Sequence, residues 1–390
     1  MREVRLLWVV PRFGAGLVGG AEMLVRGLAT RALPEGWRSE IATTCATNHF
    51  TWANTLSPGT AEEDGVMVHR FPVGGRDGAR YEELHPRILS GEASYTEELE
   101  WLANSVWSPE LQHFLENSVD DYDLALFSPY LFGTTVWGAQ VDPGRSALVP
   151  CLHDEPYARL ETVRRVIESA HGYLFNSDAE AQLAHDLYQL DDGSVVGLGW
   201  DPPGASPQAD FAAPRDLGDF VLYAGRLEEG KRVHVAVDYA MRYADERKDA
   251  PRLVLIGQGT YEPPEAAAGV IVHAGFVSED EKRAAYAEAL ALVNPSHMES
   301  LSIVLMEAWL EGTPALVDSG SAVLREHAER SGGALLFDSY ESYRDGLDRL
   351  REDADLRSRI GAAGREYVLD AYGWPEVRLR FRNAVEGLVS

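Results

Sequence analysis

Residues 297–314, HMESLSIVLMEAWLEGTP, carry the pattern that best indicates the fold of this chain. Glu299 and Glu307 stand eight positions apart. The apolar residues of the segment recur every three or four positions: Leu301, Val304, Leu305, Ala308 and Trp309. This spacing predicts an amphipathic helix with Glu299 at or just before its first turn. Eight helical residues rise about 12 Å, so we expect the two carboxylates to lie at opposite ends of one ligand.

The start of the same segment predicts an anion site. The first backbone N–H groups of a helix have no acceptor within the helix, and the helix dipole adds positive charge there. Here these groups belong to Ser300, Leu301, Ser302 and Ile303. A phosphate suits such a position. Two acids on either side of a diphosphate could then hold the two sugars that flank it.

The composition fits two domains and argues against several partners. The chain has 390 residues, 35 of them basic and 62 acidic, and a formal net charge of −27. Nucleic acid and anionic membranes both bind positively charged protein surfaces, so neither is expected as a partner. Cys45 and Cys151 lie in separate apolar runs and suggest no disulfide framework, which favours the cytoplasm. The apolar run 6–10 is too short for a signal peptide, and no segment is long enough for a membrane span.

Short apolar runs alternate with helical patterns, which is typical of parallel βαβ units. We expect strands of a first domain at 4–10, 39–44, 66–71, 124–127, 147–152 and 172–176. We expect strands of a second domain at 220–224, 252–256, 270–274, 291–294, 315–317 and 334–337. Both series predict an α/β domain with a doubly wound parallel sheet.

The series of strands divides the chain at 199. Residues 1–199 would form an N-terminal domain, 200–219 a linker rich in Pro, Gly, Ala and Asp, and 220–372 a C-terminal domain. The segment 76–121 interrupts the first domain and is helical in pattern. Its aromatic residues could bind an acceptor. We prefer the interpretation that they form a small core of their own.

The loop after the first strand has two interpretations. Residues 14–19, GAGLVG, match the G-x-G-x-x-G pattern of dinucleotide-binding loops. However, the second strand ends in Thr43 and Thr44, where a ribose-binding acid is expected. The glycines alone fit any ligand that the backbone must approach closely.

Several segments in order resemble the retaining glycosyltransferases of family 4. Glu299, seven residues and Glu307 resemble the Glu-x7-Glu signature of that family. The other matching segments are Gly19-Gly20-Ala21-Glu22, residues 152–156 (LHDEP), 221–231 (VLYAGRLEEGK), 253–259 (LVLIGQG) and 272–277 (VHAGFV). The resemblance covers about residues 4–375. It implies the GT-B fold, in which two Rossmann-like, doubly wound parallel-sheet domains face a deep cleft, and a terminal helix, here 373–390, that crosses back to the first domain.

The resemblance also implies the reaction. The enzyme would move a hexose-type sugar from a nucleotide-diphosphate-sugar, such as a UDP- or GDP-sugar, to a hydroxyl of a saccharide, glycolipid or small-molecule glycoside, with retention. Such a reaction belongs to polysaccharide or glycoconjugate biosynthesis. The N-terminal domain would be the acceptor side. No metal and no cofactor besides the donor substrate is expected.

The resemblance assigns individual residues to this reaction. The expected catalytic residues are His153, Arg226, Lys231 and Glu299. The expected donor-binding residues are Gly19, Gly20, Gly225, Phe276, Ser300, Leu301, Ser302 and Glu307. Phe276 could instead belong to the core. Residues 300–302 depart from the family, which more often has a glycine-containing run there.

The residue types agree with these roles. A departing nucleoside diphosphate develops negative charge, which a fixed guanidinium and ammonium stabilise. Lys231 is one of only three lysines in the chain. The other interpretation is that Arg226 and Lys231 are exposed loop cations paired with Glu228 and Glu229. His153 is followed by Asp154 and Glu155, but no second ligand cluster at metal spacing supports a metal site.

Two further functions stay open at this stage. A GT-B-fold sugar-nucleotide 2-epimerase would bind the same donor, but it would need acids placed for proton abstraction beside the anomeric carbon. A catalytically silent partner subunit would keep the fold, but it should lose its charged donor residues first. This chain retains Arg226, Lys231, Glu299 and Glu307.

Overall fold

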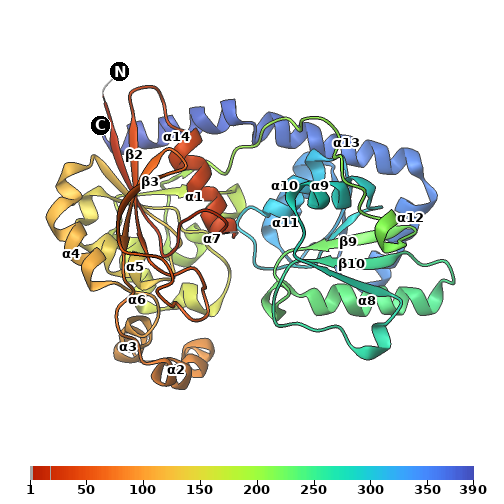
Figure 1. The fold of residues 1–390 in the computed structure, drawn as a ribbon, viewed down its shortest axis with the longest axis horizontal. Coiled ribbons are helices and arrows are strands. Elements are labelled where there is room, and N and C mark those ends of the chain that lie inside the picture. Colours follow the sequence, from red (N-terminus) through yellow and green to blue (C-terminus); the bar gives the residue numbers. More distant parts are fainter. Residues whose placement is uncertain (1–2, 18) are drawn as a thin grey trace. The chain divides into compact units, whose positions relative to one another are not determined.

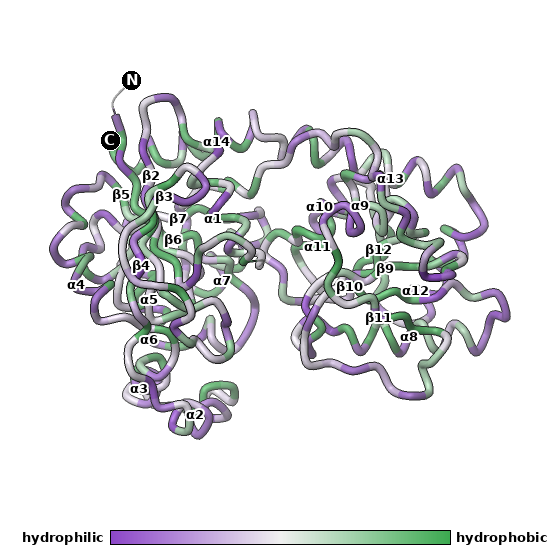
Figure 2. Tube along the Cα trace, viewed as in Figure 1, coloured by the Kyte–Doolittle hydropathy of each residue, from purple (hydrophilic) through white to green (hydrophobic). Residues whose placement is uncertain are grey.

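The computed structural model describes residues 3–17 and 19–390, and the chain forms two compact units (Figure 1). The first unit comprises the residues up to Gly199 together with Trp374–Ser390, and the second comprises Trp200–Gly373. Figure 2 shows that hydrophobic stretches run along the strands of each sheet. Within the described residues, no helix has both the length and the apolar character needed to cross a bilayer.

The first unit is built on an eight-stranded sheet with the order β3-β4-β2-β1-β5-β6-β7-β8. Its strands are β1 (Arg5–Val9), β2 (Arg38–Thr44), β3 (Gly59–Glu63), β4 (Val66–Phe71), β5 (Leu124–Phe127), β6 (Ser146–Leu148), β7 (Gly172–Phe175) and β8 (Ser194–Val195). Neighbouring strands are parallel, except that β3 runs antiparallel to β4. The six expected strands are present, and β3 and β8 were not expected. The strand order reverses at β1 and β5, the position where sheets of this kind bind ligands.

Helices accompany this sheet in the expected alternation. They are α1 (Gly20–Arg31), α2 (Gly78–Ser90), α3 (Tyr95–Ala103), α4 (Pro109–Ser118), α5 (Gly133–Val136), α6 (Glu161–Ser169), α7 (Asp178–Tyr188) and α14 (Trp374–Leu388). The terminal helix α14 belongs to this unit, where Phe381 stacks on Trp8 of β1 with ring centroids 6.2 Å apart.

The segment 76–121 is helical, as predicted, and holds α2, α3 and α4. Its apolar side chains do not form a core of their own. Trp101 and Leu115 belong to the same buried cluster as Leu7 and Phe127 of the sheet. The expectation of a separate core is wrong because α4 packs directly on β2 and β4.

The second unit is built on a six-stranded sheet with the order β11-β10-β9-β12-β13-β14. Its strands are β9 (Phe220–Ala224), β10 (Arg252–Ile256), β11 (Ile271–Gly275), β12 (Leu292–Asn294), β13 (Ala315–Asp318) and β14 (Ala334–Phe337). All neighbouring strands are parallel. The order reverses between β9 and β12, so the carboxyl ends of these two strands mark the expected ligand position.

Helices cover both faces of the second sheet. They are α8 (Val233–Glu246), α9 (Glu279–Glu288), α10 (Ile303–Leu310), α11 (Ala322–Ser331), α12 (Tyr340–Glu352) and α13 (Ala354–Ala371). Figure 1 shows α8 on one side of the sheet and α9, α10 and α13 on the other. The turn that follows α10 packs closely on α13, since a Cβ on Gly361 would lie 1.8 Å from the Gly312 carbonyl oxygen. This contact supports the helix that carries Glu307.

Residues 200–219, expected as a linker, pack onto the second unit. Phe211 is fully buried, and its ring lies 5.9 Å from that of Phe220 in β9. In α9, the carboxylates of Asp280 and Glu288 accept the N–H groups of Ala209 (2.8 Å) and Phe211 (3.0 Å). These contacts anchor the segment to the second unit. The sequence did not indicate this, because isolated apolar residues can reach the core without a periodic pattern.

Gly361→Ala should lower the stability of the second unit by about 1 to 3 kcal/mol, because the added methyl group would overlap the Gly312 carbonyl. Helix propensity alone predicts the opposite sign, since Ala favours a helix by about 1 kcal/mol over Gly. Thermal unfolding followed by circular dichroism measures the change. The control is Gly387→Ala in α14, where a Cβ would meet no atom within 4 Å. Equal melting temperatures for wild type and Gly361→Ala would rule out this close packing.

Candidate functional site

Three neighbouring strands of the second sheet end in glycine at one edge. Gly225 follows β9, Gly257 follows β10, and Gly275 ends β11. Gly257 has a φ of 138°, and a Cβ there would lie 1.8 Å from the Gly225 carbonyl oxygen. Only glycine fits such an approach. The edge where a ligand is expected therefore presents backbone groups at these positions.

Arg226 follows Gly225 at this edge. Its side chain is 54% exposed, and its Nη1 lies 3.0 Å from Glu228 Oε2. Tyr223 Oη donates to the Arg226 carbonyl (2.8 Å), which fixes the backbone. An exposed ion pair of this kind contributes about 1 kcal/mol or less. The pairing with Glu228 therefore does not prevent Arg226 from binding an anion.

Lys231 ends a single 3-10 turn, η6 (Glu229–Lys231), and is paired with Glu299. Its Nζ donates to the Met298 carbonyl (2.5 Å) and to Glu299 Oε1 (2.9 Å). The two paired side chains are 19% and 10% exposed. Two of the residues predicted as catalytic are thus in direct contact. An ammonium has three donors, so these two bonds leave one for a further acceptor.

The helix after Glu299 begins later than the sequence suggests. Helix α10 starts at Ile303, and its N-cap residue Ser302 has a φ of 64°. This left-handed conformation stops the helix from extending back to Glu299. Residues 299–301 therefore form a loop, and the 12 Å rise expected between the two carboxylates does not apply. The N–H groups without a helical acceptor accordingly lie nearer to Ile303 than expected.

Glu307 lies on α10 and already has partners. Its Oε1 accepts from Lys282 Nζ (2.9 Å), and its Oε2 accepts from Tyr286 Oη (3.1 Å). Burial alone would lower the pKa of Lys282, but Glu307 and Glu279 hold this pKa above its usual value. Removing the Glu307 carboxylate would leave a largely buried ammonium with only the exposed Glu279 as its partner. Glu307→Gln is therefore a better test of the predicted ribose contact than Glu307→Ala.

Phe276 comes directly after β11 and is 64% exposed. The interpretation that it belongs to the core is therefore wrong. An exposed aromatic ring at the carboxyl end of a strand can stack on a flat ligand. Its role beside a nucleobase stays a prediction.

The loop between β1 and α1 in the first unit is held by arginines. Three guanidinium groups donate to backbone carbonyls: Arg26 to Gly14 (2.7 Å), Arg70 to Phe13 (2.7 Å) and Arg12 to Thr47 (2.8 Å). Helix α1 begins at Gly20, with Gly19 as its N-cap residue, and no side chain caps it. A Cβ on Gly19 would collide with the Glu22 carboxylate. Val18, part of the glycine pattern, lies outside the described residues.

His153 lies in the loop after β6, which is shorter than the predicted strand. Its Nδ1 is 3.6 Å from Glu155 Oε1. The same carboxylate oxygen accepts from Tyr130 Oη (2.7 Å). His153 belongs to the first unit, as do Gly19 and Gly20, whereas the other predicted site residues belong to the second.

Glu180 on α7 is a residue that the sequence analysis missed. Its Oε1 accepts the N–H of Leu152 (2.5 Å), directly before His153, and its Oε2 accepts that of Asn176 (2.6 Å) after β7. Burial raises the pKa of Glu180 to about 8, although these N–H donors act in the opposite direction. Ser177, three positions earlier, has the spacing of a capping box. That signal could have placed Glu180 at the start of α7, but not its contact with Leu152.

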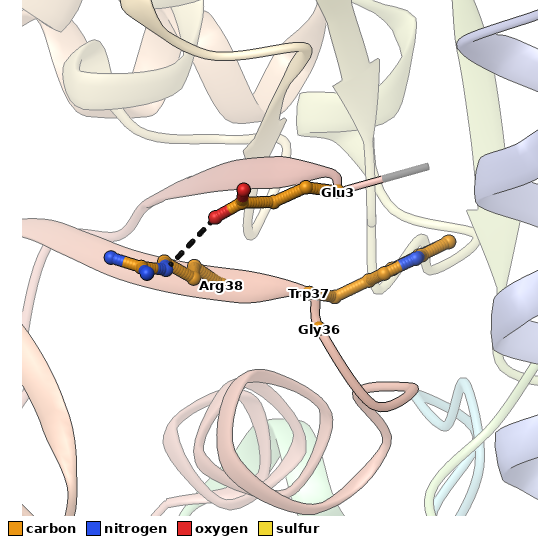
Figure 3. A pocket seen from close by; sticks show the side chains of 4 residues that line it. All are labelled: Glu3, Gly36, Trp37 and Arg38. Atoms are coloured by element: carbon orange, nitrogen blue, oxygen red, sulfur yellow. Dashed lines mark ion pairs between the residues drawn. The ribbon is translucent and has the colours of Figure 1, made fainter. Parts of the chain in front are cut away.

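A surface depression of about 300 Å³ lies at the edge of the first sheet opposite to the one that carries His153. Figure 3 shows its lining residues, Glu3, Gly36, Trp37 and Arg38, with an ion pair between Glu3 and Arg38 (3.0 Å). Arg38 begins β2, so the depression is at the amino ends of the strands. Ligands of parallel sheets bind at the carboxyl ends, and the depression is therefore not part of the candidate site.

Comparison with known proteins agrees with this fold. The structure is similar to that of Anabaena HepE solved with UDP and glucose, with a TM-score of 0.73, 15% identity, and 98% of this chain and 100% of that chain covered. It is also similar to sucrose-phosphate synthase from Thermosynechococcus elongatus, with a TM-score of 0.72, 16% identity, and 98% and 99% covered. These likenesses define the fold as GT-B, the class that two doubly wound parallel sheets predict.

The sequence comparisons identify the class of enzyme. Residues 210–367 match the model described as glycosyl transferases group 1. The chain is 26% identical, over 411 aligned positions, to a D-inositol 3-phosphate glycosyltransferase of Jonesia denitrificans, with 91% of this chain and 88% of that protein covered. The protein is a glycosyltransferase, and its residues 210–367 are similar to those of group 1. The Glu-x7-Glu pattern and the roles of the individual site residues stay predictions.

Glu180→Gln should change the pH dependence of stability. Between about pH 4.5 and about pH 8, the unfolded chain loses the Glu180 proton while the folded chain keeps it. The unfolded state then binds fewer protons, so wild type should lose stability relative to Glu180→Gln as the pH rises through this window. Urea denaturation of both proteins from pH 5 to pH 8.5 measures the difference. A constant difference across that range would mean that Glu180 is already ionised at pH 5.

Proposed function

We propose that this glycosyltransferase takes a sugar from a nucleotide-diphosphate-sugar and transfers it, with retention, to a hydroxyl of a saccharide or glycoconjugate. One observation carries the proposal: Arg226 and Lys231 lie at the carboxyl edge of β9, beside the reversal of strand order. Negative charge develops on the leaving diphosphate, and fixed cations stabilise that charge. In a chain with a net charge of −27 and three lysines, this placement favours a specific anion site.

The start of α10 supplies further positive character. Its N-cap residue Ser302 makes no side-chain cap hydrogen bond. The first N–H groups of α10 and the helix dipole then suit one phosphate of the donor. Arg226, Lys231 and these N–H groups together would hold the leaving diphosphate.

The remaining residues would hold the other parts of the donor. Oε1 of Glu299 accepts from Lys231, and its second oxygen can accept from donor-sugar hydroxyls. We assign Glu307 to the ribose hydroxyls and Phe276 to the base. Both oxygens of Glu307 already accept one hydrogen bond each, so the ribose would use their remaining lone pairs.

Retention follows if the acceptor attacks the face from which the diphosphate departs. The leaving phosphate would then take up the acceptor proton. This pathway needs no pair of carboxylates flanking the anomeric carbon, unlike glycoside hydrolysis. We assign His153 to orienting the donor sugar.

The names of the similar proteins suggest which substrates to test first. The Jonesia denitrificans relative is named for D-inositol 3-phosphate, and the Anabaena structure contains UDP and glucose. We therefore propose UDP-hexoses as first donors, with GDP-sugars next, and a phosphorylated cyclitol as the first acceptor.

A screen of nucleotide-sugars by thermal unfolding tests the donor class. A ligand at about 100 times its Kd stabilises the folded state by about 2.7 kcal/mol. Stabilising donors would then be incubated with candidate acceptors, and NMR of the product would give the anomeric configuration. An inverted product would disprove retention. An active enzyme that uses no nucleotide-sugar would disprove the donor class.

Arg226→Ala should lower kcat/KM by roughly 100-fold, because the guanidinium is removed where negative charge develops. Its exposed pair with Glu228 contributes little to stability, so the melting temperature should stay close to that of wild type. Lys231→Ala should lower kcat/KM by a similar factor. Lys248→Ala removes an exposed lysine and is the control for net charge. Transfer by Arg226→Ala at the rate of Lys248→Ala would exclude the proposed phosphate contact.

Activity should survive excess EDTA. Arg226, Lys231 and the N-terminus of α10 would supply the positive field that a divalent ion provides elsewhere. Among the described residues, no three His, Cys, Asp or Glu side chains are placed so that they could hold one metal ion together. Initial rates before and after chelation measure the effect. Complete loss of activity that Mg²⁺ or Mn²⁺ restores would contradict the prediction.

A further inference from the structure

We propose that Asn294 is a positioning residue, which keeps the N-terminus of α10 free for the donor diphosphate by binding the Ser302 hydroxyl. The proposal rests on the proposed function of α10 in holding that diphosphate.

Ser302 has an unusual conformation for its position. A serine at an N-cap position normally has extended φ and ψ angles, and its hydroxyl accepts an N–H of the first turn. Ser302 instead has a φ of 64° and a ψ of 72°, and it makes no cap hydrogen bond. Residues other than glycine rarely adopt this region unless the surroundings hold them there. A specific contact must therefore compensate for the strain.

Asn294 supplies that contact. It is the last residue of β12, and its Nδ2 donates to Ser302 Oγ (3.0 Å). Its Oδ1 accepts the N–H of Ser296 (3.0 Å). Asn294 and Ser302 are both buried, with 5% and 3% of their surface exposed. One amide group thus binds both ends of the loop 296–302.

The middle of the same loop is held by Lys231, which binds Met298 and Glu299. Glu299 is therefore fixed from two sides, by Lys231 directly and by Asn294 through the loop ends. The Asn294 contact has a further effect, because it turns the Ser302 hydroxyl away from the N–H groups that it would otherwise cap. Those groups stay available to a phosphate.

Four proteins test the proposal: wild type, Asn294→Ala, Ser302→Gly and the double variant. UDP or GDP, whichever wild type binds more tightly, is titrated by calorimetry. Asn294→Ala should bind about tenfold more weakly, because the freed hydroxyl competes for the first-turn N–H groups. Ser302→Gly should bind within about threefold of wild type, since glycine keeps the backbone N–H through which Ser302 was expected to bind the donor, adopts a φ of 64° without strain and has no hydroxyl.

The double variant gives the decisive result. Without a hydroxyl to restrain, the loss of Asn294 should matter little, so nucleotide binding should return to within about threefold of wild type. A purely structural or ligand-contacting role of Asn294 predicts instead that the double variant binds as weakly as Asn294→Ala. Weak binding by Ser302→Gly alone would mean that the hydroxyl itself contacts the nucleotide. Either of these results would overturn the proposal.

A measurement without ligand separates this proposal from the proposed function. Hydrogen exchange of the peptide covering 300–306 should be slower in Asn294→Ala than in wild type, because the hydroxyl then caps α10. Exchange as fast as in wild type, or faster, would overturn the proposal even if the protein transfers sugar. Slower exchange in a protein that binds neither UDP nor GDP would support the positioning role and contradict the proposed donor. Asn383→Ala, at an exposed position of α14, is the control.

Discussion

Two largely buried lysine–glutamate pairs organise the carboxyl edge of the second sheet. Lys231 with Glu299 and Lys282 with Glu307 each have an N–O distance of 2.9 Å. Two of the three lysines in the chain thus bind the two glutamates of the sequence pattern. Removing one partner of a buried pair costs about 3 to 5 kcal/mol, so η6, the loop before α10, α9 and α10 must stay where these pairs can form. The geometry of the proposed donor site depends on this constraint.

The sequence predicted most of the fold because its strands are continuous apolar runs. The strands Val66–Phe71, Phe220–Ala224, Arg252–Ile256 and Ala334–Phe337 have the predicted boundaries. The strands β3 and β8 were missed for a physical reason. Residues of β3 are mostly exposed and polar on the edge of the sheet, and β8 has two residues. The segment 200–219 was misjudged because its buried side chains, Trp200, Phe211 and Leu217, are too far apart in sequence to leave a periodic signal.

The sequence pointed to residues of the candidate site only where the expected chemistry follows from residue type. Arg226 and Lys231 are cations in a glycine-bordered loop after a strand, and that pattern is visible along the chain. Lys282, Asn294 and Glu180 each form a hydrogen bond with a residue at least eight positions away in sequence, in addition to a nearer partner. No local pattern links such residues, because the fold alone brings them together. The start of α10 was misplaced for a similar reason, since the left-handed Ser302 depends on its contact with Asn294.

Under the proposed function, a donor that binds at this edge gives Arg226 and Lys231 a new anionic partner. Arg226 is exposed and weakly paired with Glu228, so a phosphate can replace that carboxylate at little cost and can form a bidentate contact. Lys231 and Glu299 are buried together, so Lys231 would keep its partner and offer the phosphate its remaining donor. The contact of Lys231 gains strength as charge accumulates on the departing diphosphate, because a low-dielectric setting enlarges the interaction. Arg226 would therefore both hold the donor and stabilise the departing diphosphate, and the buried Lys231 would add most to the rate of sugar transfer.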